Sequence, residues 1–102
     1  MLFRSGSCWD SLKLLQGTAI HVIHVNDYPA NPPREKITDA DRVYPGNGIA
    51  PLTSFLRNLQ AIEFRGSLSL ELFNRTYWKQ DALTVARTGL GKIRAAVQKA
   101  LV

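Results

Sequence analysis

The sequence predicts an α/β fold with a small parallel sheet. Two β-rich runs, residues 19–25 (AIHVIHV) and residues 67–73 (SLSLELF), alternate with segments whose apolar residues recur at helical spacing. The helical segments are residues 7–16, 51–62 and 80–101. Because a strand followed by a helix and a second strand forms a parallel pair, we expect about two adjacent parallel strands and three helices.

Local signals mark the predicted helices. Ser7 and Asp10 match a capping box at the start of the first helix. Pro51 suits the first turn of the second helix, where proline's missing N–H is not needed. The apolar face of that helix consists of Leu52, Phe55, Leu56, Leu59 and Ile62. Gly89 and Gly91 weaken the last helix without ending it.

A long polar loop, residues 24–48, joins the first strand to the second helix. Its sequence, HVNDYPANPPREKITDADRVYPGNG, holds four prolines, two glycines and three aspartates. Gly46 and Gly48 permit a tight turn into the helix. Loops of this length are functional lids or are disordered, and the sequence leaves both readings open. Residues 74–78, after the second strand, are expected to be irregular.

Two parallel strands do not make a domain by themselves. A parallel sheet needs both faces covered and neighbours for its edges, and no further strand is predicted in this chain. We therefore interpret residues 1–102 as the C-terminal portion of a (β/α)8 TIM barrel, a fold of about 250 residues. Ligands of such barrels lie at the carboxyl ends of the strands.

The charge pattern argues against a nucleic-acid partner. The net charge is +5, and most of the excess lies in residues 82–102, which hold four bases and no acid. These bases are Arg87, Lys92, Arg94 and Lys99. Their spacing places them on polar stripes of one helix, which we interpret as a solvated face. We expect no membrane partner, since no apolar run approaches ~18 residues. A single cysteine, Cys8, and no visible signal peptide predict a cytoplasmic protein.

His24 and Glu71 are the ionisable residues near the ends of the two predicted strands. Strand alternation leads us to expect both side chains on the same side, at the same end of the sheet. An imidazole and a carboxylate from adjacent strands can form half of a divalent-metal site, but each can instead be a hydrogen-bonded or solvent-facing residue. His21 falls on the opposite face, where we expect it to pack against the helices.

The same residues carry a resemblance to a known family. "IHVIHVND", then "DRVYPGNG", an amphipathic helix and "GSLSLELF" resemble the end of xylose-isomerase-like sugar isomerases and epimerases. "YWKQDALTVARTGL" is similar to the closing segment of bacterial sugar phosphate isomerase/epimerase proteins. The likeness covers nearly all of this chain but only about the last two-fifths of a family barrel.

The resemblance implies roles for three residues. His24 matches a metal-binding histidine, and Glu71 matches the last metal-ligating glutamate, which also acts as acid/base. Arg42 matches an arginine that reaches a substrate hydroxyl or the partner acid. The implied chemistry is proton transfer beside the carbonyl of a sugar or sugar phosphate, through an enediolate, with a divalent ion (Mn, Mg, Co or Zn) as cofactor.

The family's other two metal ligands lie on strands that this sequence lacks. We therefore expect the chain to be inactive alone, and whether it acts as an enzyme stays open at this point. One alternative is a non-catalytic remnant or an association module that pairs through open sheet edges. Another is a DNA repair protein like endonuclease IV, whose loop carries an Asp-x-His motif. Here Asp41-Arg42-Val43 stands in its place, which disfavours DNA cleavage.

Overall fold

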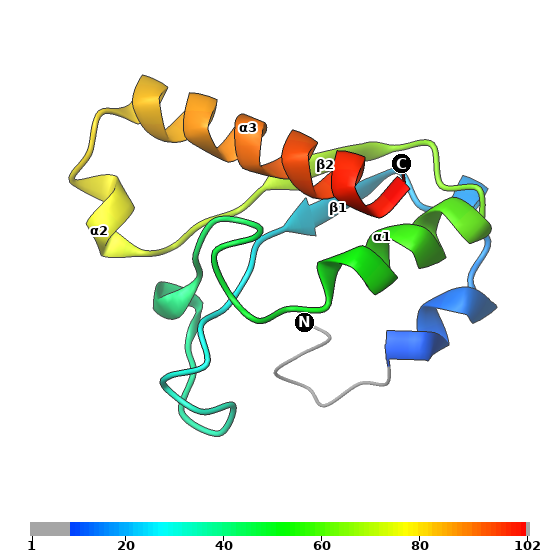
Figure 1. Ribbon diagram of the computed structural model, residues 1–102, viewed down its shortest axis with the longest axis horizontal. Helices are drawn as coiled ribbons and strands as arrows, with labels where there is room; N and C mark the ends of the chain where they lie inside the picture. The colour runs from blue at the N-terminus through cyan, green and yellow to red at the C-terminus, as the bar shows by residue number, and fades with distance from the viewer. Residues whose placement is uncertain (1–8, 102) are drawn as a thin grey trace.

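The structure, a computed structural model, describes residues 9–101. Ser7 of the predicted capping box and Cys8 lie outside the described residues. The elements follow one another along the chain as shown in Figure 1. They are η1 (Trp9–Leu14), η2 (Gly17–Ala19), β1 (Val22–Val25), η3 (Asp39–Asp41), α1 (Leu52–Ala61), β2 (Ser67–Leu70), α2 (Arg75–Trp78) and α3 (Ala82–Leu101).

The predicted parallel pair is confirmed. β1 and β2 run parallel, with Val22 opposite Ser67 and Val25 opposite Leu70. Both strands are shorter than the β-rich runs, but the pairing continues for one residue because the Glu71 N–H donates to the Val25 carbonyl at 3.2 Å. Glu71 therefore follows directly on the end of β2, where a βα loop begins.

The first predicted helix is present, as the 3-10 helix η1 at Trp9–Leu14, and it ends two residues before the predicted end at about residue 16. One local prediction was wrong: residues 74–78 are not irregular, since α2 forms a single turn at Arg75–Trp78. The Asn74 side chain caps this turn by accepting from the Thr76 N–H at 3.0 Å.

Helices cover one face of the two-stranded sheet. Leu68 of β2 and Ile23 of β1 pack against a core that the helices supply. The buried members of that core are Leu12, Leu56, Leu59 and Ala100. α1 lies between η1 and α3, and α3 runs along the strands (Figure 1). This side of the sheet has the cover that a parallel sheet requires.

The opposite face of the sheet is open to solvent. The Val22 side chain is 54% exposed, and Ser67 and Ser69, on the same face, are exposed as well. This is the face that points to the interior in a barrel. His21, which we expected to pack against the helices, is exposed, because it precedes β1 and lies beyond the helical cover.

Gly89 sets the distance between α3 and β2. A Cβ atom at this position would lie 2.1 Å from Cδ2 of Leu70. The missing side chain therefore lets the helix approach the strand closely. As predicted, α3 continues through both of its glycines. Within residues 9–101, no helix is both long and apolar enough to cross a membrane.

Candidate functional site

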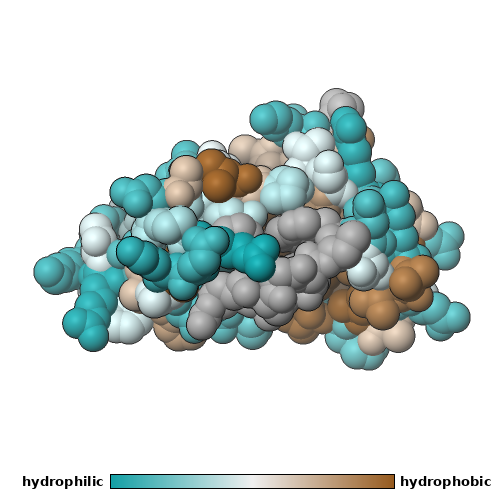
Figure 2. Space-filling view, turned by 90° about the horizontal axis from the view of Figure 1, so that it is seen from below, coloured by the Kyte–Doolittle hydropathy of each residue, from teal (hydrophilic) through white to brown (hydrophobic). Residues whose placement is uncertain are grey.

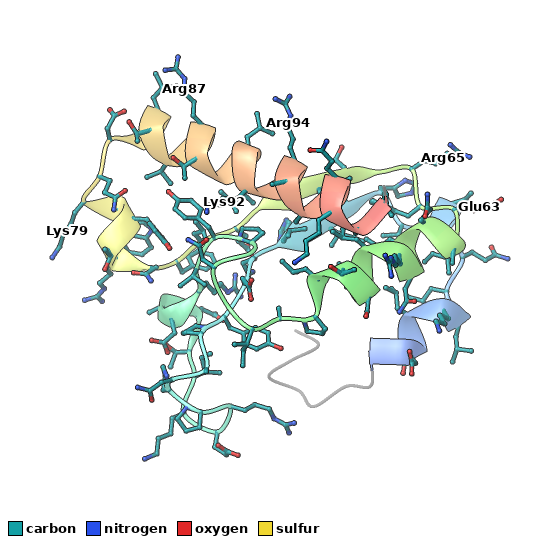
Figure 3. All side chains as sticks on the ribbon, in the orientation of Figure 1. Glu63, Arg65, Lys79, Arg87, Lys92 and Arg94 are labelled. Carbon is teal, nitrogen blue, oxygen red and sulfur yellow. The ribbon has the colours of Figure 1, made fainter. Side chains whose placement is uncertain are left out.

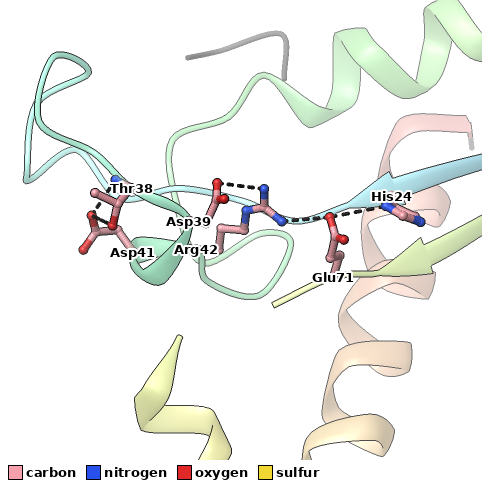
Figure 4. Close-up of polar contacts among 6 residues, drawn as sticks. All are labelled: His24, Thr38, Asp39, Asp41, Arg42 and Glu71. Atoms are coloured by element: carbon pink, nitrogen blue, oxygen red, sulfur yellow. Dashed lines mark hydrogen bonds and ion pairs between the residues drawn. The ribbon is translucent and has the colours of Figure 1, made fainter. Parts of the chain in front are cut away.

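The end of the sheet brings His24 and Glu71 together. His24 is the third residue of β1, and Glu71 directly follows β2. Nδ1 of His24 lies 3.3 Å from Oε2 of Glu71, on the open face of the sheet (Figure 4). The predicted convergence of the two side chains is confirmed. Both remain accessible, with 59% of the His24 side chain and 31% of the Glu71 side chain exposed.

Arg42 joins this pair from the long loop. Its Nη1 donates to Oε2 of Glu71 at 2.8 Å, and its Nη2 donates to Oδ1 of Asp39 at 2.9 Å. Only 8% of the Arg42 side chain is exposed, and its guanidinium lies 5.1 Å from the centre of the Phe73 ring. A buried guanidinium shared by two carboxylates is held in a defined orientation.

A buried carboxylate, Asp27, closes the loop that carries Arg42. Its Oδ1 accepts from the N–H groups of Tyr28 (2.8 Å) and Ala50 (2.9 Å). Its Oδ2 accepts from the N–H groups of Gly46 (2.9 Å) and Gly48 (3.1 Å). Asp27 is 1% exposed, so these four N–H groups replace water as its hydrogen-bond partners. The start and the end of the loop are thereby joined at one side chain.

Backbone contacts place Arg42 beside the strand end. The Asp27 N–H donates to the Val43 carbonyl at 2.9 Å, and the Val43 N–H donates back to the Asp27 carbonyl at 3.0 Å. Val43 directly follows Arg42, and Asp27 lies three residues after His24. A Cβ atom on Gly48 would lie 2.1 Å from the Tyr28 carbonyl, so the turn requires glycine at that position.

Tyr44 fixes the loop to the helices. Its side chain is buried, and its ring centre lies 4.5 Å from that of Tyr77 in α2. The ring also lies beside α3, because a Cβ atom on Gly89 would be 3.6 Å from Cε1 of Tyr44. Burial raises the pKa of the Tyr44 hydroxyl above 10.0, and the neighbouring Tyr77 adds to the rise. The loop is therefore held at its base and at Tyr44, which favours the functional reading of the loop over the disordered one.

His24 and Glu71 fit the donor set of a divalent ion. Around a tetrahedral ion, a nitrogen and an oxygen ligand at their usual distances lie about 3.4 Å apart. The two side chains show that spacing already. Across residues 9–101, no group of three or more His, Cys, Asp or Glu side chains is arranged to hold a metal. The described residues thus supply two donors, and their role as ligands stays a prediction.

Sequence reasoning missed two residues of this site. Asp39 was counted as a polar loop residue, although it holds the second nitrogen of Arg42. Its spacing of three residues from Arg42, across a short turn, was the available signal. Asp27 was also overlooked. Most of its hydrogen-bond donors lie about twenty residues further along the chain, so no local spacing signalled this contact.

Comparison with known proteins gives a consistent result. The model of the family described as xylose isomerase-like TIM barrel matches residues 3–96. An inosose isomerase of Bacillus velezensis is 36% identical over 94 residues, which are 92% of this chain and 33% of that protein. An inosose isomerase of Bacillus subtilis is 37% identical over 81% of this chain and 30% of its own length.

Solved structures lead to the same family. The crystal structure of the IOLI protein with a bound zinc atom has a TM-score of 0.85 and 34% identity, and the match covers 94% of this chain and 34% of that one. A xylose isomerase domain protein from Alicyclobacillus acidocaldarius has a TM-score of 0.79 and 26% identity, over 97% of this chain and 35% of its own. This chain spans about a third of the length of these relatives. With its two parallel strands, its flanking helices and this family match, the chain belongs to the xylose isomerase-like TIM barrel family.

Proposed function

We propose that this chain forms the C-terminal portion of a divalent-metal-dependent isomerase or epimerase that acts on an inosose-like polyhydroxy ketone or a related sugar. The observation that carries the proposal is the 3.3 Å contact between His24 and Glu71 on the open face of the sheet, with Arg42 on the same glutamate oxygen. Support for the substrate class comes from the inosose isomerases that the chain resembles.

The proposed reaction moves a proton beside a carbonyl group. Glu71 takes the proton from the carbon next to the carbonyl, the electron pair of that C–H bond moves to the carbonyl oxygen, and an enediolate forms. Returning the proton to the former carbonyl carbon yields the isomer, provided that the proton of the adjacent hydroxyl group passes to the former carbonyl oxygen. Returning the proton to the opposite face of the same carbon yields the epimer. A bound divalent ion would supply electrostatic stabilisation for the developing negative charge on oxygen.

Each residue of the site has a defined part in this proposal. His24 and Glu71 would hold the ion, and Glu71 would also transfer the proton. Arg42 donates to Oε2 of Glu71, so it orients this carboxylate. A second acid/base group and further ligands would have to come from outside residues 9–101, which supports a function within a larger barrel.

A chimera tests this proposal directly. Residues 9–101 replace the matched third of the Bacillus velezensis inosose isomerase, and inosose isomerisation is assayed with and without added divalent metal. We expect an active chimera that loses activity when metal is chelated. Glu71→Gln should lower kcat by about 10²-fold or more, the usual contribution of a positioned acid/base group.

Glu63→Gln is the matched control in the chimera. Glu63 is an exposed glutamate in the turn after α1, well away from the end of β2 (Figure 3). Its exchange should leave kcat within about twofold of the unaltered chimera. A folded chimera without activity, or one in which both glutamine variants behave alike, contradicts the proposed role of Glu71.

Association is a second candidate function, favoured by the open sheet face. In the described part of the chain the sheet has two strands, so each has one unpaired edge. Exposed apolar side chains include Leu14 (86%) and Leu15 (53%), and Figure 2 shows apolar atoms gathered at one end of the face viewed from below. Light scattering of the purified chain tests this candidate, since concentration-dependent dimers support it and a monomer at all concentrations contradicts it.

A further inference from the structure

Asp39 is the outermost member of a row of charged side chains at the site. The row runs from His24 through Glu71 and Arg42 to Asp39 (Figure 4). Arg42 occupies the middle, with one terminal nitrogen on each carboxylate. A guanidinium has its donors in a rigid fork, so fixing one nitrogen restricts where the other can point.

The charges of this row favour a bound cation. With Glu71 alone, the buried Arg42 would cancel the negative charge that a metal ion needs. With Asp39 on the second nitrogen, the positive charge of Arg42 is shared between two carboxylates instead of falling on Glu71 alone. Asp39 does not contact His24 or Glu71, so it would act through Arg42.

We propose that Asp39 is a positioning residue of the metal site: it holds Arg42 in the orientation that meets Glu71, and it offsets the charge of Arg42 so that Glu71 remains attractive to a divalent ion. This inference rests on the proposed metal-binding role of His24 and Glu71. Asp39 would itself contact neither metal nor substrate, and it lies on the loop, 32 residues before Glu71.

The same short turn supplies a matched control, Asp41. The Asp41 carboxylate accepts from the N–H of Thr38 at 2.8 Å and from its hydroxyl at 3.2 Å, and so faces away from Arg42 (Figure 4). Asp41→Asn removes the same charge from the same turn as Asp39→Ala, and its amide oxygen can still accept from Thr38, so the capping box of the turn is kept. Only Asp39→Ala removes a partner of Arg42.

Two measurements on the whole chain at constant pH test the proposal. The first is the NMR signal of the Arg42 terminal nitrogens, which are resolved when the guanidinium is held and average when it rotates freely. The second is zinc affinity, followed on the ring signals of His24. For Asp39→Ala we expect averaged Arg42 signals and zinc binding weakened by about fivefold. Asp39→Asn should restore the Arg42 signals, because its amide oxygen can still accept from Nη2.

Asp41→Asn should resemble the unaltered chain in both measurements. The proposal is overturned if Asp39→Ala leaves the Arg42 signals and the zinc affinity unchanged, or if Asp41→Asn alters both to the same extent. If the unaltered chain shows no zinc response at His24, the proposed metal site fails, while the Arg42 signals still decide whether Asp39 positions the arginine.

Discussion

Replacing Asp27 by asparagine should open the loop that carries Arg42. In the structure each carboxylate oxygen of Asp27 accepts from two backbone N–H groups. Asparagine keeps one oxygen and places an NH2 group where the other oxygen was, so two N–H groups lose their acceptor. Each hydrogen bond to a charged group contributes about 1.5–3 kcal/mol, which gives a loss of about 3–6 kcal/mol for Asp27→Asn.

This loss need not unfold the whole chain. Domains of this size have total stabilities of about 5–15 kcal/mol, and a loop can open while the helices stay packed. The effect should therefore be largest in the loop. Native-state hydrogen exchange of the Gly46, Gly48 and Ala50 amides should become faster by at least about 100-fold, since each 1.4 kcal/mol is tenfold. Exchange at Ile93, in α3, reports global unfolding separately.

Asp10→Asn is the control for Asp27→Asn. Asp10 is exposed and lies 3.7 Å from Lys13 on the surface, so its exchange should change stability by no more than about 0.5 kcal/mol. Loop amides of Asp27→Asn that exchange within tenfold of the unaltered chain would refute the reasoning. That result would mean that the four hydrogen bonds do not hold the loop.

Two further predictions concern α3. Gly91→Ala should stabilise the fold by about 0.8–1 kcal/mol, because a Cβ atom there meets nothing within 4 Å. Gly89→Ala should lose that gain, because its Cβ atom would contact Leu70. Equal stabilisation of both variants in urea denaturation would contradict this prediction. The backbone and hydroxyl hydrogen bonds from Thr84 lower the pKa of the Asp81 carboxyl below 3.8. The stabilisation that the ionised Asp81 carboxylate gives to the first turn of α3 should thus be fully present above pH 3.8 and lost as the pH falls through the lowered pKa. The loss of helical circular dichroism that accompanies this protonation should be absent from Asp81→Ala.

The sequence predicted the elements whose apolar pattern is strong. The two β-rich runs pair in parallel as expected, and α3 follows its apolar spacing through Gly89 and Gly91. Patterns of this kind are decided by burial along the whole element, so they survive local weaknesses. The convergence of His24 and Glu71 was predictable for the same reason, because strand alternation and parallel pairing fix the side and the end of the sheet.

The remaining differences depend on contacts that a linear pattern does not contain. His21 was expected to pack because alternation continued the strand backwards, but β1 begins at Val22 and the helices do not cover the preceding residue. α2 was missed although Asn74 carries a cap signal, since a single turn has too few residues to show a period. The partnership of Asp39 and Arg42 depends on the folded loop, which spacing alone does not determine.

The central claim is that His24 and Glu71 form a metal-binding pair, and zinc binding to the isolated chain tests it most directly. The chain has two histidines, and His21 serves as the internal control because it is also exposed but lies just before β1. As zinc is added at constant pH, the ring signals of His24 should shift at concentrations about tenfold lower than those of His21, a difference of 1.4 kcal/mol from the second ligand. Glu71→Gln should abolish this preference, whereas equal responses of the two histidines, or a His24 response that Glu71→Gln leaves unchanged, would contradict the claim.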